Sequence, residues 1–98
     1  MREGVCRDHA ILVGRKGVAR YVLAGLYKVF VEKCSTIKYS ALGKSIYRAV
    51  AAAEALSRLL GFVYVKRVQI SSIIVSEEGR TRRISRIEIL MSRMDEEP

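Results

Sequence analysis

Three arginines stand close together at a place where the chain is expected to turn back on itself. Arg80, Arg82 and Arg83 follow the Glu-Glu-Gly sequence at residues 77–79, between two runs whose alternating pattern predicts strands. Arg86 extends the series into the second strand. Arginine is the side chain that narrow minor grooves attract, and a two-stranded ribbon can follow a groove or its flanking backbone. This hairpin therefore predicts a contact with nucleic acid, although charge at strand edges also serves solubility.

Two further basic pairs stand where helices are expected to begin. Arg15 with Lys16 precedes the first helix, and Lys44 with Arg48 lies at the start of the second, directly after Gly43. Backbone N–H groups and the helix dipole favour phosphate at such positions. Arg48 follows Lys44 by one helical turn on the same face, which suits two backbone phosphates. An ordinary solvated basic face remains the alternative.

The overall composition agrees with a polyanion partner. The chain has 98 residues, of which 18 are Lys or Arg and 10 are Asp or Glu, and its net charge is +8. Such a balance favours DNA, RNA or anionic membrane as partner. Because no apolar run approaches the roughly 18 residues of a spanning helix, and no signal peptide is evident, we expect no membrane association and a cytoplasmic protein. Half of the residues are hydrophobic, which predicts a single folded domain.

Residue types used in catalysis and metal binding are sparse. His9 is the sole histidine, and Cys6 and Cys34 stand 28 positions apart without a Cys-x-x-Cys pair. We therefore expect no metal, no cofactor and no enzymatic activity. Both cysteines are expected to be reduced thiols, with Cys34 buried near a helix end. The absence of Asn and the excess of Arg over Lys are typical of a thermophilic source.

Hydrophobic periodicity predicts the element order βαβαββ. The apolar run 10–13 predicts an interior strand, and residues 18–30 and 46–60 have helical spacing, with Gly61 in the left-handed position that ends the second helix. Residues 36–41 alternate as a half-buried strand. Residues 62–75 predict a long bent strand with a bulge near Lys66 and Arg67, and residues 80–91 predict the last strand.

These elements predict an α/β fold of the α+β sandwich type. We expect a four-stranded mixed sheet with two helices on one face and a protruding C-terminal β-hairpin. The other face of the sheet is then solvated or covered by a second copy. The expected domain spans residues 10–93, between a flexible N-terminal tail at 1–9 and an acidic C-terminal tail at 94–98.

Two nucleotide-binding motifs are matched only in part. Residues 43–45 read Gly-Lys-Ser, but Lys38 stands where a phosphate-binding loop requires its first glycine. Residues 58–65 share Arg and Gly-Phe-Val with a strand of RNA-recognition domains, yet the stacking aromatics are missing and the element order differs. Neither assignment is adopted.

The motifs at residues 11–16, 18–24 and 41–46 and the arginine hairpin, taken in this order, resemble the Alba family of archaeal chromatin proteins over residues 10–90. The resemblance implies a dimer that coats duplex DNA in the nucleoid and can bind RNA. Relatives include protein subunits of eukaryotic RNase P, so an RNA-binding or ribonucleoprotein role is the alternative function. A small structural protein whose charge is incidental is a third possibility.

The resemblance also implies roles for single residues. The family's basic pair matches Arg15 and Lys16, its basic-Gly-basic turn matches residues 42–44, and its arm matches the hairpin arginines. Leu42 departs from the basic pattern, which suggests a second paralogue that can form heterodimers as well as homodimers. Arg15 replaces the lysine at which acetylation weakens DNA binding, which leaves Lys16 as the candidate for acetylation and a deacetylase as a partner. Leu60, with Phe62 close by, matches the position of dimer–dimer contact.

Overall fold

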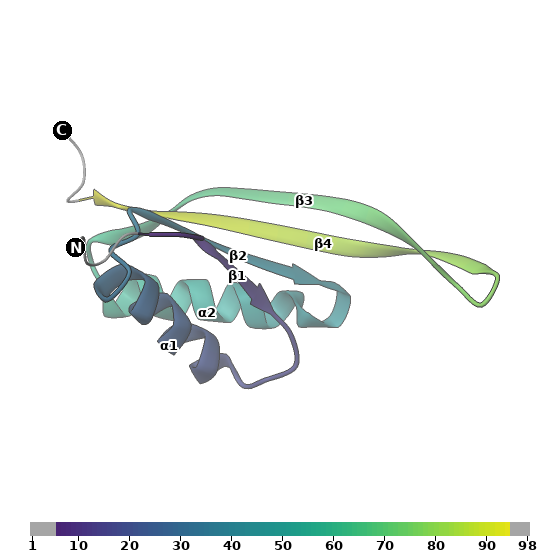
Figure 1. Cartoon of the computed structure of the whole chain (residues 1–98), viewed down its shortest axis with the longest axis horizontal. Helices are drawn as coiled ribbons and strands as arrows, with labels where there is room; N and C mark the ends of the chain where they lie inside the picture. The colour runs from purple at the N-terminus through teal and green to yellow at the C-terminus, as the bar shows by residue number, and fades with distance from the viewer. Residues whose placement is uncertain (1–5, 95–98) are drawn as a thin grey trace.

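The computed structural model describes residues 6–94 as one layer of sheet covered by two helices (Figure 1). The elements are β1 (Ala10–Val13), α1 (Val18–Phe30), β2 (Thr36–Leu42), a 3-10 turn η1 (Gly43–Ser45), α2 (Ile46–Leu59), β3 (Val63–Glu77) and β4 (Arg80–Arg93). The sheet order is β1-β2-β4-β3, with β1 parallel to β2 and the other pairs antiparallel. This confirms the expected βαβαββ order, the mixed four-stranded sheet and the two helices.

The core lies between the helices and one face of the sheet. Residues at alternate positions of β2 and β4 are buried, and the register pairs them: Ile37 with Met91, Tyr39 with Ile89, and Ala41 with Ile87. Directly paired residues share a face, so these six side chains form one apolar surface. The alanines and Leu56 of α2 and the valines of α1 cover it.

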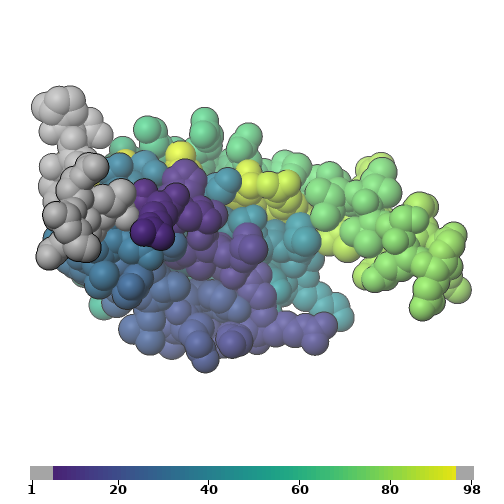
Figure 2. Space-filling model, in the orientation of Figure 1, coloured from purple at the N-terminus to yellow at the C-terminus, as the bar shows by residue number. Residues whose placement is uncertain are grey.

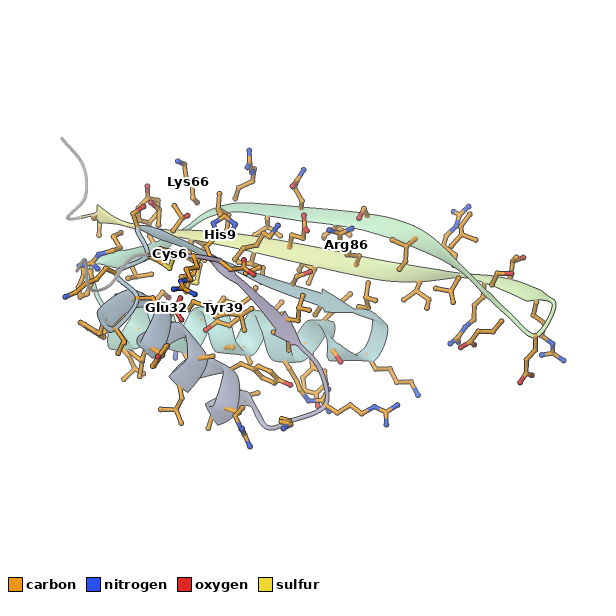
Figure 3. All side chains as sticks on the ribbon, viewed as in Figure 1. Cys6, His9, Glu32, Tyr39, Lys66 and Arg86 are labelled. Carbon is orange, nitrogen blue, oxygen red and sulfur yellow. A yellow bond between two sulfur atoms is a disulfide. The ribbon has the colours of Figure 1, made fainter. Side chains whose placement is uncertain are left out.

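Helix α1 approaches its neighbours closely at Gly25. A Cβ atom added there would collide with the Tyr39 hydroxyl oxygen and would lie 2.8 Å from Cδ2 of Leu56. The glycine thus permits α1 to lie directly on β2 and α2. Tyr39 is fully buried at this point, and its hydroxyl donates a hydrogen bond of 2.7 Å to the carbonyl oxygen of Tyr21 in α1 (Figure 3). Burial raises the pKa of the Tyr39 hydroxyl.

The last two strands form a hairpin that extends beyond the helices as an arm, most clearly seen as the green segment in Figure 2. Pairing runs from Val63 with Arg93 to Glu77 with Arg80. The two turn residues have positive φ, 48° at Glu78 and 76° at Gly79, as two-residue turns matching the strand twist require. The register shifts between residues 65 and 67, which confirms the predicted bulge.

Two local predictions were wrong. Strand β1 pairs with β2 alone and lies at the edge of the sheet, and the side chain of Leu12 is 79% exposed. Four consecutive apolar residues do not show which of them face outward. Gly61 is not among the glycines with positive φ, because Leu60 already leaves the helix with φ −114° and ψ 96°. A hydrogen bond from the amide of Val63 to the carbonyl of Leu60 closes the turn.

The prediction of reduced thiols was also wrong, because Cys6 and Cys34 form a disulfide. Cys34 is fully buried, as expected. The bond forms because residues 6–9 run beside the start of β2. The amide of Lys38 donates to the carbonyl of His9 at 2.8 Å, and Nδ1 of His9 lies 3.1 Å from Oγ1 of Thr36. Residues 6–9 of the expected tail are therefore attached to the domain, while residues 1–5 and 95–98 lie outside the described part.

The disulfide is expected to contribute to stability. It closes a separation of 28 residues, for which the loss of unfolded-chain entropy corresponds to about 3 to 4 kcal/mol. Replacement of the exposed Cys6 in Cys6→Ser should lower the free energy of unfolding by about this amount in denaturant titrations. As a control, a reductant should destabilise the wild type and leave Cys6→Ser unchanged. Equal stability of the oxidised wild type and the variant would contradict this role.

Candidate nucleic-acid interface

An open groove of about 740 Å³ lies where the β1–α1 loop, η1 and the base of the hairpin meet. Five of its lining side chains are cationic, and none of the described residues that line it is acidic. Neutral residues complete the wall. The lining residues are Arg15, Leu42, Gly43, Lys44, Ser45, Arg48, Arg82, Arg83, Ile84 and Ser85. The fold thus brings together cations from three segments that are distant in the sequence.

The β1–α1 loop supplies Arg15 to the groove. Arg15 and Lys16 are both exposed, but Lys16 does not line the groove. Helix α1 begins after Gly17 with no side-chain cap and no acidic residue in its first turn. The positive end of the helix dipole is therefore not neutralised locally, which favours an anion near this loop.

The η1 turn supplies Lys44, and its conformation depends on Gly43. The φ of Gly43 is +53°, in the left-handed region that favours glycine. A Cβ atom at this position would lie 3.4 Å from Cγ2 of Ile84, so η1 rests against the base of the hairpin. The side chain of Lys44 is exposed at the groove, and no residue of the described chain forms an ion pair with it.

Arg48 connects α2 to the β1–α1 loop. Its Nη1 donates a hydrogen bond of 3.2 Å to the carbonyl oxygen of Gly14, and its guanidinium lies 4.7 Å from the ring centre of Tyr47. These contacts hold the guanidinium at the groove wall beside Lys44. The predicted pair, Lys44 and Arg48, therefore lies on one surface, with Arg48 held by two contacts.

The hairpin contributes two of its predicted arginines to the groove. Arg82 and Arg83 line it, whereas Arg80 lies at the tip in a separate recess with Glu77, Glu78 and Arg82. Nη2 of Arg82 is 4.0 Å from Oε1 of Glu77, and both side chains are 69% exposed. An ion pair of this length at such exposure is weak, so Arg82 is available to an anion.

Arg86, labelled in Figure 3, does not line the groove itself but lies in a neighbouring recess that shares Leu42 and Ser45 with it. It forms an ion pair and a hydrogen bond with Glu88, whose carboxylate is also 3.4 Å from Nζ of Lys38. The hydrogen bond from Arg86 and the charge of Lys38 lower the pKa of Glu88 against the opposing effect of desolvation, so the carboxylate stays ionised. The reason is strand alternation: Ile87 faces the helices, and its neighbours Arg86 and Glu88 face the other way.

The residues assigned to dimer–dimer contact lie at the end of α2 opposite to η1. Leu60 and Phe62 are partly buried against the core. The ring of Phe62 makes an edge-on contact with Phe30 at 6.2 Å between ring centres, and the guanidinium of Arg93 lies 5.1 Å from the ring of Phe62. Phe30 and Leu59, which adjoin them, are exposed apolar side chains. Phe62 is thus largely occupied within its own chain.

Sequence reasoning missed several residues of the interface. The helical spacing of residues 18–30 did not distinguish Tyr21 from its apolar neighbours, but its hydroxyl accepts hydrogen bonds from the amides of Gly14 and Lys16. Ser45, Ile84 and Ser85 were not expected in the groove. A tyrosine shortly after a glycine-rich loop was the one signal available for Tyr21. The other residues had none, because their place depends on how η1 meets the hairpin.

Other kinds of site find little support in the part of the chain that is described. Within residues 6–94, no group of three or more His, Cys, Asp or Glu side chains is placed to hold a metal ion. Over the same residues, neither helix combines the length and the apolar composition that crossing a bilayer requires.

The fold and the groove define a small basic α+β domain with a cationic groove at one end of its sheet. No family model matches the chain. It is 40% identical over 88 residues to the DNA/RNA-binding protein Alba of Methanocella arvoryzae, covering 88% of this chain and 91% of that protein. It is 36% identical over 87 residues to the DNA/RNA-binding protein Alba 1 of Archaeoglobus fulgidus, covering 88% and 97%.

Solved structures agree with these relatives. Alba from Thermoplasma volcanium superposes with a TM-score of 0.76 at 29% identity, covering 86% of this chain and 99% of that one. ALBA1 from Trypanosoma brucei, at 23% identity, shares the fold with a TM-score of 0.72 over 92% of this chain and 75% of its own. The chain belongs to the Alba family.

The positive φ of Gly43 gives a test of how η1 positions Lys44. A side chain in the left-handed region costs about 1 to 2 kcal/mol, so Gly43→Ala should lower the free energy of unfolding by about that amount or shift η1. Denaturant titration measures the first outcome, and NMR chemical shifts of residues 43–45 measure the second. Gly61→Ala is the matched control, because a Cβ atom there meets nothing within 4 Å. Equal behaviour of the two variants would contradict the role assigned to Gly43.

Proposed function

We propose that this protein coats double-stranded DNA as a dimer and compacts it as a chromatin protein, with little dependence on sequence. The observation that carries the proposal is the groove, in which five cations from three separate segments meet without a carboxylate among its lining residues. A polyanion that touches this surface releases its counterions, which is the main source of affinity for nucleic-acid backbones.

The side chains at the groove suit phosphates better than base edges. The start of α2 meets it, and α1 begins just after the loop that supplies Arg15. Neither helix has a side-chain cap or an acidic residue in its first turn. Asparagine is absent from the sequence, and the single glutamine, Gln69, pairs in register with Glu88, away from the groove. The amide side chains that read adenine are therefore missing from the interface. Contacts to the backbone fix position and carry no sequence information directly.

An exposed apolar surface supports assembly of two copies. Val65, Val68, Ile70 and Ile74 follow one another along β3, and the last two are 75% and 70% exposed. A second groove of about 420 Å³ lies between this part of β3 and α2 and is lined mainly by apolar side chains, including Val50. Apolar area of this kind favours burial against another chain. Joining two copies here would place two cationic grooves and two hairpin arms in one particle.

RNA is the second candidate partner. The curated relatives are named DNA/RNA-binding proteins, and a surface that contacts backbone phosphates accepts either polymer. Competition of a labelled DNA duplex with an RNA duplex of matched length and with an RNA hairpin distinguishes the two. A tenfold preference corresponds to about 1.4 kcal/mol. Preference for RNA by that margin would replace the chromatin role with a ribonucleoprotein role.

Salt dependence tests the groove directly. If a dimer neutralises about 6 to 10 phosphates, affinity for duplex DNA should fall by about 10³ to 10⁵ between 50 and 200 mM salt. Lys44→Ala should weaken binding to all sequences and reduce the slope of log affinity against log salt by about 0.9 for each phosphate that the variant no longer neutralises. Fluorescence anisotropy over a salt series gives both quantities.

Lys66→Ala is the matched control for Lys44→Ala, because it removes the same charge from an exposed position near the start of β3 that does not line the groove. Its slope should equal that of the wild type. Equal slopes for all three proteins would mean that the groove does not carry the binding, and affinity that is nearly flat in salt would exclude phosphate contacts as its source.

The proposed dimer is tested by placing a charge on its surface. Ile70→Glu should raise the dissociation constant of the dimer by more than about tenfold, because an ionised carboxylate would be buried without a partner. Leu12→Glu is the control, since Leu12 is 79% exposed on the edge strand, away from β3. Sedimentation equilibrium measures the constants. A wild type that is monomeric at micromolar concentration would contradict the dimer proposal and would not affect the proposed role of the cationic groove.

A further inference from the structure

We propose that Tyr21 is a positioning residue of the nucleic-acid interface. Its hydroxyl holds the β1–α1 loop in the conformation that presents Arg15 and Lys16. The inference rests on the proposed function, because it assigns a role within the same binding surface. Tyr21 itself is buried, with 7% of its surface exposed, and does not line the groove. It acts through the loop and not by contact with the ligand.

The Tyr21 hydroxyl binds the backbone of the loop at two points. Its oxygen accepts one bond of 2.9 Å from the amide of Gly14 and another of 3.1 Å from the amide of Lys16. These two amides flank Arg15, so a single oxygen gathers the backbone on both sides of that residue. The loop between β1 and α1 contains two glycines, Gly14 and Gly17, in four residues. Such a sequence is flexible unless its backbone groups have fixed partners.

The position of the Tyr21 side chain is fixed by contacts that Tyr21 makes in the core. Tyr21 lies in the first turns of α1, and its carbonyl oxygen accepts the hydrogen bond from the buried Tyr39 of β2 at 2.7 Å. A continuous series of contacts therefore runs from the middle of the sheet, through α1, to the loop. Because both rings are packed in the core, the acceptor oxygen has little freedom to follow a moving loop.

A second contact connects the same loop to α2. The amide of Gly14 donates to Tyr21, while its carbonyl oxygen accepts from Arg48, which lines the groove. Both polar groups of this residue are thus bound by side chains of different helices. The arrangement sets the position of Arg15 relative to Arg48 and Lys44 before any ligand arrives. Ordering a loop residue costs conformational entropy, so ordering the loop before binding increases affinity.

Removal of one oxygen tests the proposal, because Tyr21→Phe keeps the ring in the core and deletes the acceptor. Amide hydrogen exchange of Gly14 and Lys16, measured by NMR on the free protein, should become at least about tenfold faster, as expected for the loss of one ordinary hydrogen bond. Affinity for a DNA duplex should fall about tenfold by the same reasoning. In an Arg15→Ala/Lys16→Ala background, Tyr21→Phe should have no further effect on affinity.

Val29→Ala is the control for stability, because it removes buried methyl groups near the end of α1 that lies farthest from the loop. It should lower the unfolding temperature and leave both the loop amides and duplex affinity unchanged. This separates positioning from a general loss of stability.

Three results would overturn the role of Tyr21: unchanged exchange of the two amides, faster exchange with unchanged affinity, or a full effect in the Arg15→Ala/Lys16→Ala background. A wild type that binds no duplex would instead overturn the proposed function. The exchange measurement, which needs no nucleic acid, tells these failures apart.

Discussion

The close approach of α1 to the sheet at Gly25 is the constraint on which the rest of the molecule depends. No larger residue fits there without displacing the hydroxyl of Tyr39 or the side chain of Leu56. Because the helix lies this close, the buried hydroxyl of Tyr39 reaches the backbone of Tyr21 and is not left without a partner. The start of α1 is thereby held against the sheet, and the basic loop that precedes the helix inherits this position. The packing of the core thus fixes the position of the basic loop at the surface.

The positions of the carboxylates determine which basic side chains remain without an acidic partner. Glu88 is paired with Arg86 and Lys38 on the outer face of the sheet, and other acidic residues pair with basic neighbours along the helices, as in Lys28–Glu32 and Arg58–Glu54. These basic residues contribute little free charge. The cations of the groove have no such partners within the described chain, apart from the long contact of Arg82. The groove therefore brings several unpaired cations together at one end of the sheet, where a phosphate backbone can contact them at once.

The hairpin has two surfaces with different chemistry. Its base, at residues 82–85, forms one wall of the cationic groove, and the part of β3 near α2 exposes aliphatic side chains. The bulge after Val65 shifts the side-chain alternation of β3, so Val68 and Ile70 face the same side as Ile89 and Ile87, with which they pair. One strand pair can therefore serve both phosphate contact and association with a second chain. The two roles do not compete, because they use different stretches of the hairpin.

The sequence by itself determined the elements and their order, since periods of two and 3.6 residues and the Glu-Gly turn are local properties of the chain. It also placed basic residues next to turns, and three of these clusters meet in the groove. Only the tertiary structure decided which basic residues of these clusters line the groove together. Arg86 lies on the other face of the sheet because the direction of a strand residue depends on its pairing partners. Strand β1 is an edge strand because the strand order is set by helix packing. Cys6 meets Cys34 across 28 residues of sequence. The role of the Tyr21 hydroxyl was hidden for the same reason: an aromatic residue in an apolar stripe reveals its polar contact only when the neighbouring loop is in place.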